Sequence, residues 1–498
     1  MKHLVCLLSV AGALVCPAVF ERATPESQGV PSAAIEAFVN ACEKELDGIH
    51  GFVLLRHGKR VAEGWWHPFD AHLTQHVFSH SKVFSSTAVG LLYDEGKIKL
   101  DDRLIDIFPD KAPAQPSEEA KLVRVRDLLT MNVGQNTEAI FVEPDGDWVQ
   151  ALLRNKFDRK PGTGFRYDSC ASHVLAAIVE RKTGRKLMDY LDEKLFRKIG
   201  IQGAWTNVGP DGIACGGWGM NFKTLDLARL GQLYLQEGLW EGEQVLSREW
   251  VQLATSHQTK TDRTDGGDWA QGYGFQFWRC RNNCYRADGA SGQYTIVMPD
   301  QDAVLSITAG LSDMAHEQNL VWKHLLPALK EPVLPEDPVA FASLQARCRT
   351  LQMKPVSGNA APAQPVPFGT TFDLTGDAGR FGLKDVALAS RGTGWVLAFT
   401  GLCGRQEIPV GQNEWRHGRV RLEREKYEKL GGLIGEQPTA ASGAWTHHGT
   451  FETRVLLTGT PSWMHFKLTF KAEGTLALNY SLWGWGGGSW NLTGTVRR

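Results

Sequence analysis

The sequence predicts an α+β protein, in which an antiparallel sheet is flanked by helices and an all-helical layer, followed by a C-terminal all-β barrel or sandwich. Three observations carry this prediction. Helical and strand-like patterns alternate up to residue 330, a proline-rich stretch follows, and period-two hydrophobic runs dominate residues 369–498. The chain has 498 residues, which favours more than one folded unit.

Residues 1–18 have the features of a secretory signal peptide. Lys2 precedes an apolar run from Leu4 to Val15, and small residues lead to Ala18. Such a segment is removed on export, so we expect cleavage near Ala18 and a periplasmic or secreted protein. The alternative is a buried N-terminal helix or strand, because the run is too short to span a bilayer. No membrane span is expected elsewhere.

The first unit, residues 19–330, begins with a helix and a hairpin. Apolar residues over 35–46 recur at helical spacing after Ser32, a residue type that caps helices. Two strand-like runs, 52–55 and 61–66, flank a short turn. The unit is therefore expected to place an early hairpin in its sheet.

Helical patterns then dominate until strands return near the end of this unit. Helical spacing runs from Ser79 to Gly96, where glycine ends it as a C-cap would. Further helical patterns lie at 171–183, 224–237 and 315–329, and strand-like runs lie at 272–279 and 292–308. Both ends of the unit should therefore supply strands to one sheet, with a helical layer inserted between them.

Residues 331–368 are rich in proline and alanine and predict a linker. Beyond it, alternating runs such as 395–399, 451–457, 466–470 and 476–480 predict the C-terminal β unit, residues 369–498. This unit suggests no chemistry, but contact with cell wall or glycan is one role that its strands allow.

The charge balance bears on which binding partners to expect, and the cysteines bear on disulfides and metal sites. The 54 Lys and Arg balance 55 Asp and Glu, so no global field attracts nucleic acid, and a small-molecule or peptide substrate is expected. Two of the nine cysteines fall in the signal, which leaves an odd number. Cys280 and Cys284 are expected either to form a disulfide across a turn or to be two buried thiols. No residue cluster has zinc spacing, and no metal or other cofactor is expected.

A Ser-x-x-Lys motif, Ser79 and Lys82, opens the helical run at 79–96. A spacing of three places both side chains on one helical face. A serine hydroxyl needs a base at neutral pH, and burial lowers the pKa of a lysine enough for it to serve. The backbone N–H of Ser79, at a helix N-terminus, suits half of an oxyanion hole. Taken alone, the motif is as readily a chance match as a site.

Two later segments add weight to the motif. Tyr167 and Ser169 end a glycine-rich loop just before a helical stretch, and a lysine near such a tyrosine would lower its pKa for proton transfer. Alone, the tyrosine would simply pack at the start of a helix. Residues 287–292, Ala-Asp-Gly-Ala-Ser-Gly, precede a strand and either let a substrate backbone approach or form a hairpin turn.

These pieces, in this order, resemble the serine β-lactamase and penicillin-binding protein superfamily. The match is with the class C β-lactamase and esterase branch, including its D-aminopeptidase-like members, and covers roughly residues 22–330. It rests on the stretch 76–109, on Val-Arg-Asp-Leu-Leu-Thr-Met at 125–131, on 225–231 and on Gly-Tyr-Gly-Phe at 272–275. The resemblance implies a β-lactamase-like fold.

The resemblance also implies site residues. Ser79 would be the acylated nucleophile, Lys82 and Tyr167 the base pair, and the N–H groups of Ser79 and Ala290 the oxyanion hole. Further substrate contacts would come from Ser169, Gly289 and Ser291.

Two departures from the family pattern bear on the substrate. The family has Asn where this chain has Ser169, whose hydroxyl reaches less far. It has Lys where this chain has Ala287, which cannot hold the carboxylate of a β-lactam or a D-Ala-D-Ala peptide. Arg286 should point to the opposite face of the strand. Asp288 favours an amine-bearing substrate or, preferably, is a solvated loop carboxylate.

Other residues near the motifs have plainer interpretations. Trp65, Trp66, Trp218, Trp269 and Trp278 suggest aromatic walls around a pocket, but core packing is the default for each. His80 follows the nucleophile, yet neighbouring side chains on a helix diverge, so it is not expected to complete a triad.

The function expected from these residues is an exported serine hydrolase that cleaves an ester or amide through an acyl-enzyme and is a poor β-lactamase. Its substrate would be a small ester, a D-amino-acid peptide or a short linear amide. Alternatives are a true β-lactamase or DD-carboxypeptidase, and a non-catalytic sensor or cell-wall binding protein. A pure binder would not need Ser79, Lys82 and Tyr167 together, which disfavours that last alternative.

Overall fold

Most of the chain is described by its structure, a computed structural model. The residues not described are 1–19, 331, 364, 378, 380, 423–434, 448, 472–473, 485–486 and 498. The predicted signal peptide therefore lies outside the described residues. Within the described ranges, no helix combines the length and apolarity needed to cross a bilayer.

A six-stranded antiparallel sheet runs through the first unit in the order β2-β1-β11-β10-β9-β8. The early hairpin lies beside the late strands, since Leu54 of β1 pairs with Leu305 of β11. This confirms that both ends of the unit supply strands. The strands are β1 (Ile49–Arg56), β2 (Lys59–Trp65), β8 (Trp278–Arg279), β9 (Tyr285–Gly289), β10 (Gln293–Met298) and β11 (Ala303–Ala309).

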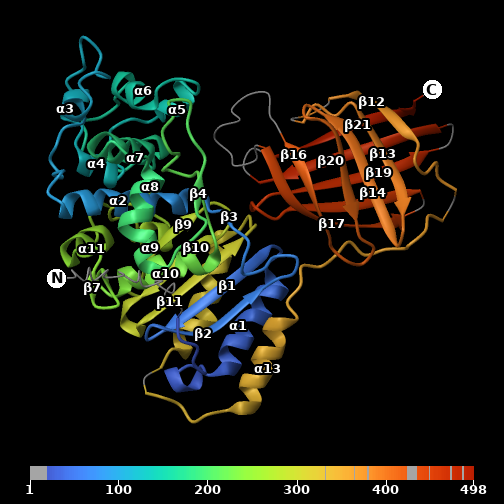
Figure 1. Cartoon of the computed structure of the whole chain (residues 1–498), viewed down its shortest axis with the longest axis horizontal. Coiled ribbons are helices and arrows are strands. Elements are labelled where there is room, and N and C mark those ends of the chain that lie inside the picture. Colours follow the sequence, from blue (N-terminus) through green and yellow to red (C-terminus); the bar gives the residue numbers. More distant parts are fainter. Residues whose placement is uncertain are drawn as a thin grey trace, which may run out of the picture.

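Helices cover both faces of this sheet (Figure 1). Alternation along β1 sends Phe52 into a core with α1 (Ser32–Glu45), α12 (Met314–Leu320) and α13 (Pro338–Arg349). Val53 faces the opposite core, which holds α2 (Ser81–Asp94) and α10 (Thr224–Leu235). The sheet is thus buried on both sides, and β9, the neighbour of the edge strand β8, contacts α2 of the helical layer.

The helical layer surrounds α2, which is buried along almost its whole length. Its helices are α3 (Leu104–Ile107), α4 (Val125–Leu129), α5 (Ala139–Val142), α6 (Trp148–Arg154), α7 (Ser169–Thr183), α8 (Leu187–Leu191), α9 (Arg197–Ile199) and α11 (Arg248–Thr255). Short strands complete it: β3 (Gln75–His76), β4 (Trp205–Thr206), β5 (Met220–Phe222), β6 (Leu239–Trp240) and β7 (Glu243–Gln244). As predicted, Gly96 ends the α2 region, with a positive φ of 69°.

The structure differs from the predicted elements in three places. Only residues 278–279 of the run 272–279 form a strand, because Gln276 has a left-handed backbone (φ 69°) that breaks the extended path. The run 292–308 contains two strands rather than one. The predicted linker holds helix α13, capped by Asp337 and packed on α1. Pro332, Pro335 and Pro338 stand at or before the helix start, where they are compatible with a helix, and the other prolines of the segment follow the end of the helix.

The C-terminal unit is a nearly closed antiparallel barrel, which confirms the all-β prediction. Its ten strands run in the order β15-β14-β13-β12-β21-β20-β19-β18-β17-β16, and the two end strands lie together. Aromatic and aliphatic side chains fill the interior. The strands are β12 (Thr371–Gly376), β13 (Asp385–Arg391), β14 (Gly394–Gly401), β15 (Gly404–Val410), β16 (Arg416–Leu422), β17 (Gly435–His447), β18 (Thr450–Leu457), β19 (Trp463–Lys471), β20 (Thr475–Trp483) and β21 (Gly488–Val496).

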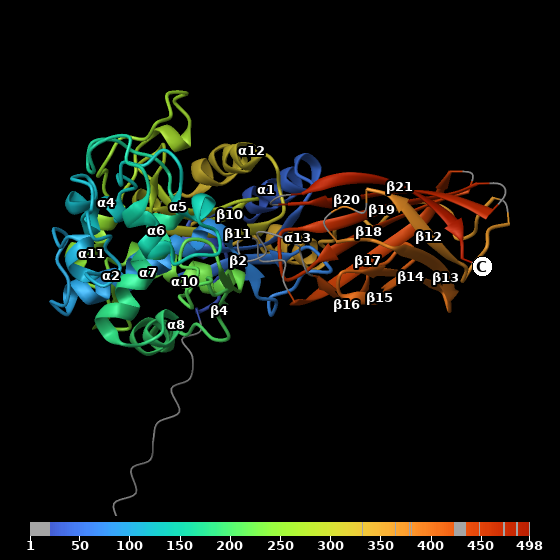
Figure 2. The ribbon, with the colours of Figure 1, turned by 90° about the horizontal axis from the view of Figure 1, so that it is seen from above.

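The barrel packs against the first unit (Figure 2). The indole of Trp415 is buried and donates a 2.9 Å hydrogen bond to the carbonyl of Met353. In the β18–β19 turn, the carbonyl of Gly459 accepts a 2.9 Å hydrogen bond from the backbone N–H of His76, three residues before Ser79. The two units therefore share an interface that reaches the predicted nucleophile segment.

Candidate active site

Ser79 lies in a tight turn that leads directly into α2. The turn is a 3₁₀ segment, Phe78–His80, and Phe78 has a left-handed backbone with φ 46°. Such a conformation is costly for a bulky residue and persists only where packing holds it. Here the buried ring of Phe78 lies edge-on to His76, with ring centroids 4.6 Å apart. The turn presents Ser79 at the start of the helix.

Lys82 joins three of the elements around Ser79. Its Nζ lies 3.2 Å from Ser79 Oγ, 3.2 Å from Ser169 Oγ and 2.6 Å from the carbonyl oxygen of Gly217. A charged ammonium has three donors, so these contacts satisfy all of them. Burial lowers the pKa of Lys82 to about 8, against the opposing charges of Glu138, Asp168 and Asp288. A substantial fraction of neutral, basic lysine is therefore present near neutral pH.

Gly217 is a site residue that the sequence interpretation missed. A Cβ at Gly217 would lie 2.6 Å from the carbonyl oxygen of Ser169, and one at Gly216 would lie 2.5 Å from Ser85 Oγ. Only glycines allow this loop to lie flat against α2 and α7 and deliver its carbonyl to Lys82. The Gly-Gly pair was the one available sign of such a close approach.

Tyr167 lies on the other side of Ser79. The Ser79 hydroxyl acts to lower the pKa of the Tyr167 phenol, and the Tyr167 ring centroid is 4.8 Å from Lys82 Nζ. The ring stacks on Trp278 at 5.6 Å. Burial, reinforced by the charge of Asp288, raises the pKa of Tyr167 well above its usual range. The prediction of a lowered pKa is wrong, because burial outweighs the Ser79 hydroxyl and the Arg286 charge, which act to lower the pKa, and Tyr167 is a protonated phenol.

Glu138 and Asp168 are two further carboxyls at the site that the motifs did not reveal. Glu138 Oε2 accepts hydrogen bonds from the backbone N–H groups of Ser169 at 2.7 Å and Cys170 at 3.3 Å. Asp168 caps α7 by accepting from Ala171 N at 2.9 Å. Burial raises the pKa of both carboxyls, and Lys82 opposes this. They hold the helix start that carries Ser169.

Asp288 is not the solvated loop carboxylate that the sequence favoured. It lies in β9 with about 8% of its surface exposed and forms an ion pair with the fully buried Arg286 at 3.0 Å. The N–H of Trp269 donates to the same carboxylate at 3.0 Å. Strand alternation does place Arg286 opposite Ala287, as predicted, and its guanidinium lies over the Trp269 ring, where it forms the ion pair that balances the charge of Asp288.

Residues 289–292 form the hairpin turn between β9 and β10. A Cβ at Gly289 would lie 2.0 Å from the Val77 carbonyl oxygen and 3.0 Å from His80 N, so this glycine packs directly on the nucleophile turn. Ser291 has a left-handed backbone, and its carbonyl accepts a hydrogen bond from Leu311 N. Among the described residues, the N–H of Ala290 has no acceptor. It is available to a ligand oxygen beside Ser79.

The remaining candidates have structural environments. His80 is buried and its Nε2 lies 2.8 Å from Thr295 Oγ1, away from any triad geometry. Of the five tryptophans, Trp269 and Trp278 lie at the site beside Tyr167 and Asp288, and Trp218 follows Gly217. Trp65 and Trp66, at the end of β2 and just after it, pack in the core clusters.

Cys280 and Cys284 are free, buried thiols, so the structure has the second of the two predicted alternatives. No cluster of metal-ligating side chains occurs among the described residues.

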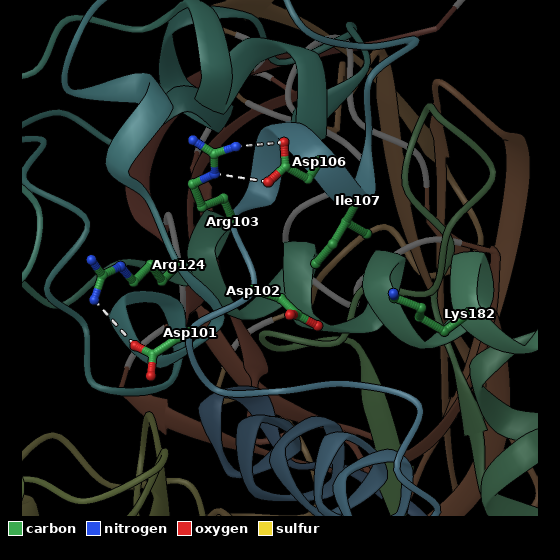
Figure 3. A pocket seen from close by; sticks show the side chains of 7 residues that line it. All are labelled: Asp101, Asp102, Arg103, Asp106, Ile107, Arg124 and Lys182. Atoms are coloured by element: carbon green, nitrogen blue, oxygen red, sulfur yellow. Dashed lines mark hydrogen bonds and ion pairs between the residues drawn. The ribbon is translucent and has the colours of Figure 1, made fainter.

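A polar surface pocket of about 500 Å³ lies away from these residues (Figure 3). Arg103 pairs with Asp106, and Arg124 pairs with Asp101. Its lining comprises Asp101, Asp102, Arg103, Asp106, Ile107, Arg124 and Lys182. None of the predicted site residues lines this pocket.

The chain is similar to several known proteins. The Beta-lactamase family profile matches residues 20–325. The 6-aminohexanoate-dimer hydrolase of Paenarthrobacter ureafaciens is 27% identical over 329 residues, 59% of this chain and 82% of the relative. Penicillin-binding protein 4 of Amycolatopsis lactamdurans is 26% identical over 374 residues, 66% of this chain and 92% of the relative.

A Brucella anthropi D-aminopeptidase is 28% identical, but over only 35% of this chain and 36% of the relative. A solved Bacillus anthracis structure, named for 6-aminohexanoate-dimer hydrolysis, superposes with a TM-score of 0.50 at 18% identity. It covers 62% of this chain and 86% of its own, and it shows the shared fold alone.

The site and the fold define a serine hydrolase with a β-lactamase-like catalytic unit. The chain belongs to the beta-lactamase family.

Proposed function

We propose that this protein is an exported hydrolase that cleaves a small ester, a D-amino-acid peptide or a short linear amide through an acyl-enzyme on Ser79, and that it is a poor β-lactamase. The observation that carries the proposal is the convergence of Lys82 on the hydroxyls of Ser79 and Ser169, with the Tyr167 ring beside the same lysine. These groups supply a nucleophile, a base and a proton donor.

In the acylation step, Ser79 Oγ forms a bond to the substrate carbonyl carbon while its proton passes to neutral Lys82. The N–H groups of Ser79 and Ala290 stabilise the carbonyl oxygen as it becomes negative. As the tetrahedral intermediate collapses, Tyr167 donates its proton to the leaving nitrogen or oxygen and regains one from Lys82. The net result is that one proton moves from Ser79 to the leaving group through Lys82 and Tyr167.

Deacylation reverses these roles with water as the nucleophile. Neutral Lys82, assisted by the Tyr167 hydroxyl, accepts the proton of the attacking water, and that proton then returns to Ser79 Oγ as the acyl–oxygen bond breaks. The products are a carboxylic acid and free enzyme, with no change in oxidation state.

The substrate class follows from charge and from the relatives. Ala287 offers no cation to a substrate carboxylate, and the carboxyls of Glu138, Asp168 and Asp288 surround Lys82. Two relatives are named for a 6-aminohexanoate dimer and for D-aminopeptidase activity. On these two grounds, we propose that this chain hydrolyses amides or esters rather than β-lactams.

Labelling with a fluorophosphonate probe tests the nucleophile. Wild-type protein should be labelled at Ser79, and Ser79→Ala should not. A Ser86→Ala variant, which removes a buried hydroxyl on the same helix, serves as the control and should still be labelled. Equal labelling of wild type and Ser79→Ala would end the proposal of Ser79 catalysis.

The substrate class is tested with three chromogenic compounds. We expect hydrolysis of a short p-nitrophenyl ester and of D-alanine p-nitroanilide to exceed hydrolysis of nitrocefin in kcat/KM. Nitrocefin as the best of the three would contradict the inference from Ala287 and favour a true β-lactamase.

Export is proposed from the N-terminal sequence alone. N-terminal sequencing of protein recovered from the periplasm or medium should find a chain that begins near residue 19. An uncleaved chain retained in the cytoplasm would contradict it.

A further inference from the structure

The carboxylate of Asp288 is held by two hydrogen-bond donors and one ion-pair contact, which all reach the same oxygen. Arg286 Nε lies 3.1 Å and Arg286 Nη2 lies 3.0 Å from Oδ2, and Trp269 Nε1 lies 3.0 Å from Oδ2 as well. Arg286 is fully buried, with its guanidinium 4.6 Å from the Trp269 ring. This arrangement fixes the orientation of the carboxylate within the strand.

The second oxygen of Asp288 is left without a donor. Among the described residues, no N–H or O–H group bonds to Oδ1, and the side chain keeps 7% of its surface exposed. Because Arg286 and Trp269 contact Oδ2, and Oδ1 is not a fully buried atom, the exposed part of the carboxylate includes Oδ1. An ionised carboxylate has acceptor capacity at both oxygens, so Oδ1 can accept a hydrogen bond from a ligand.

Asp288 lies at the end of β9 that meets the nucleophile turn. Asp288 precedes Gly289, which packs on the nucleophile turn, and it stands two residues before the N–H of Ala290. Two residues of a strand span about 7 Å. The charge of Asp288 also acts to raise the pKa of both Lys82 and Tyr167. A group near the scissile carbonyl can therefore reach it.

We propose that Asp288 is a specificity-determining residue that binds a protonated amine on the acyl part of the substrate through Oδ1. This inference rests on the proposed hydrolase function and narrows its substrate class to amine-bearing acyl groups. Arg286 balances the charge of Asp288 when no substrate is bound. A bound amine then adds a charge-assisted hydrogen bond that a neutral acyl group does not offer.

The test compares each amine-bearing substrate with its des-amino counterpart. The pairs are D-alanyl and propanoyl p-nitroanilide, and 6-aminohexanoyl and hexanoyl p-nitroanilide. Wild type should prefer the amine in kcat/KM by about tenfold or more in at least one pair. Asp288→Asn should reduce that ratio by about tenfold, mainly through KM. A ratio taken within one variant does not depend on how much of the protein is folded.

Two further measurements separate recognition from a structural role. Trp269→Phe removes one donor to Oδ2 but keeps the carboxylate, so its amine preference should stay close to that of wild type. Asp288→Asn leaves the charge of Arg286 uncompensated, so this variant should gain relative activity on succinyl p-nitroanilide, which carries a carboxylate.

The outcomes are distinguishable from failure of the hydrolase proposal. A wild-type ratio near one in both pairs, or an unchanged ratio in Asp288→Asn, would overturn the amine site while Ser79-dependent hydrolysis stands. If wild type cleaves none of these anilides or a p-nitrophenyl ester faster than Ser79→Ala does, the hydrolase proposal itself fails.

Discussion

Lys82 experiences two opposing influences on its charge. Burial disfavours the ammonium and lowers its pKa to about 8, while Glu138, Asp168 and Asp288 favour the ammonium. A base whose pKa lies close to the working pH combines a useful neutral fraction with adequate basicity. The carboxyls around Lys82 thus set the pH range in which it can accept the proton of Ser79.

This balance predicts the pH dependence of the enzyme. The active form contains neutral Lys82, so kcat/KM should rise with pH through about 8 and then level off. Glu138→Gln removes a charge that favours the ammonium, so the midpoint should move to lower pH, by up to about one unit. The Gln carbonyl can still accept from Ser169 N.

The measurement is a pH profile of kcat/KM with a p-nitrophenyl ester. The matched control is Glu143→Gln. Glu143 is a carboxyl just after α5 whose charge is not among the influences on the pKa of Lys82, so this variant should leave the midpoint unchanged. A shift of the Glu138→Gln midpoint to higher pH would contradict this electrostatic account.

Tyr167 should matter most where the leaving group needs a proton. Tyr167→Phe keeps the ring on Trp278 but removes the hydroxyl. For an anilide, whose amine must be protonated to leave, kcat should fall by about 10² to 10⁴. For a p-nitrophenyl ester the loss should be smaller, since p-nitrophenolate leaves without protonation. Equal losses on the two substrates would indicate that Tyr167 only positions Ser79.

At the scale of elements, the site is the meeting of the α2 turn, the start of α7 and the β9–β10 hairpin. Gly289 packs so tightly against the nucleophile turn that there is no room for a Cβ. The contact is backbone against backbone, so neither side can rotate away from an added group. The position of β9 along the turn therefore controls where the Ala290 N–H stands.

A Gly289→Ala substitution tests this contact. Its Cβ would lie 2.0 Å from the Val77 carbonyl oxygen, so the turn or the strand must shift, at a cost of about 1–3 kcal/mol. We expect a lower Tm and slower fluorophosphonate labelling. Gly164→Ala is the control, because its Cβ would meet only the Arg159 side chain at 3.4 Å. Labelling at the wild-type rate in Gly289→Ala would contradict the role given to this contact.

At the scale of the whole molecule, the barrel is joined to the catalytic unit by a shared core. Trp415 and Leu456 of the barrel pack in the same buried cluster as Phe38 and Phe52 of the first unit. The bond from His76 N to Gly459 O extends this interface to the segment before Ser79. Two units that share a hydrophobic cluster are expected to unfold together.

Calorimetry of the full chain should therefore show one cooperative transition. Trp415→Ala, which removes a buried indole from the shared cluster, should destabilise the protein by about 3–5 kcal/mol and lower the single Tm. Trp395→Ala removes a tryptophan from the barrel interior and is the matched comparison. Two separate transitions in wild type, with Trp415→Ala shifting only one, would show that the barrel is an independent module.

The sequence by itself determined the parts of this protein that depend on near neighbours. Spacing of three placed Ser79 and Lys82 on one helical face, and hydrophobic periodicity predicted α1, the β1–β2 hairpin, α7 and α10. Periodicity is a local property, because each element must bury one face or one stripe. It failed at residues 272–277, where a left-handed Gln276 breaks the strand, and at α13, whose prolines suggested a linker.

Only the tertiary structure decided what the site residues experience. The charge of Glu138 acts on the pKa of Lys82, and the carbonyl of Gly217 accepts a hydrogen bond from it. Both lie far from Lys82 in sequence, and no spacing rule connects them. Burial reversed the expected pKa change of Tyr167. Asp288 became a buried, oriented carboxylate rather than a solvated one, because Arg286 and Trp269 converge on it. Charge, burial and hydrogen bonding depend on everything packed around a residue, which local sequence does not contain.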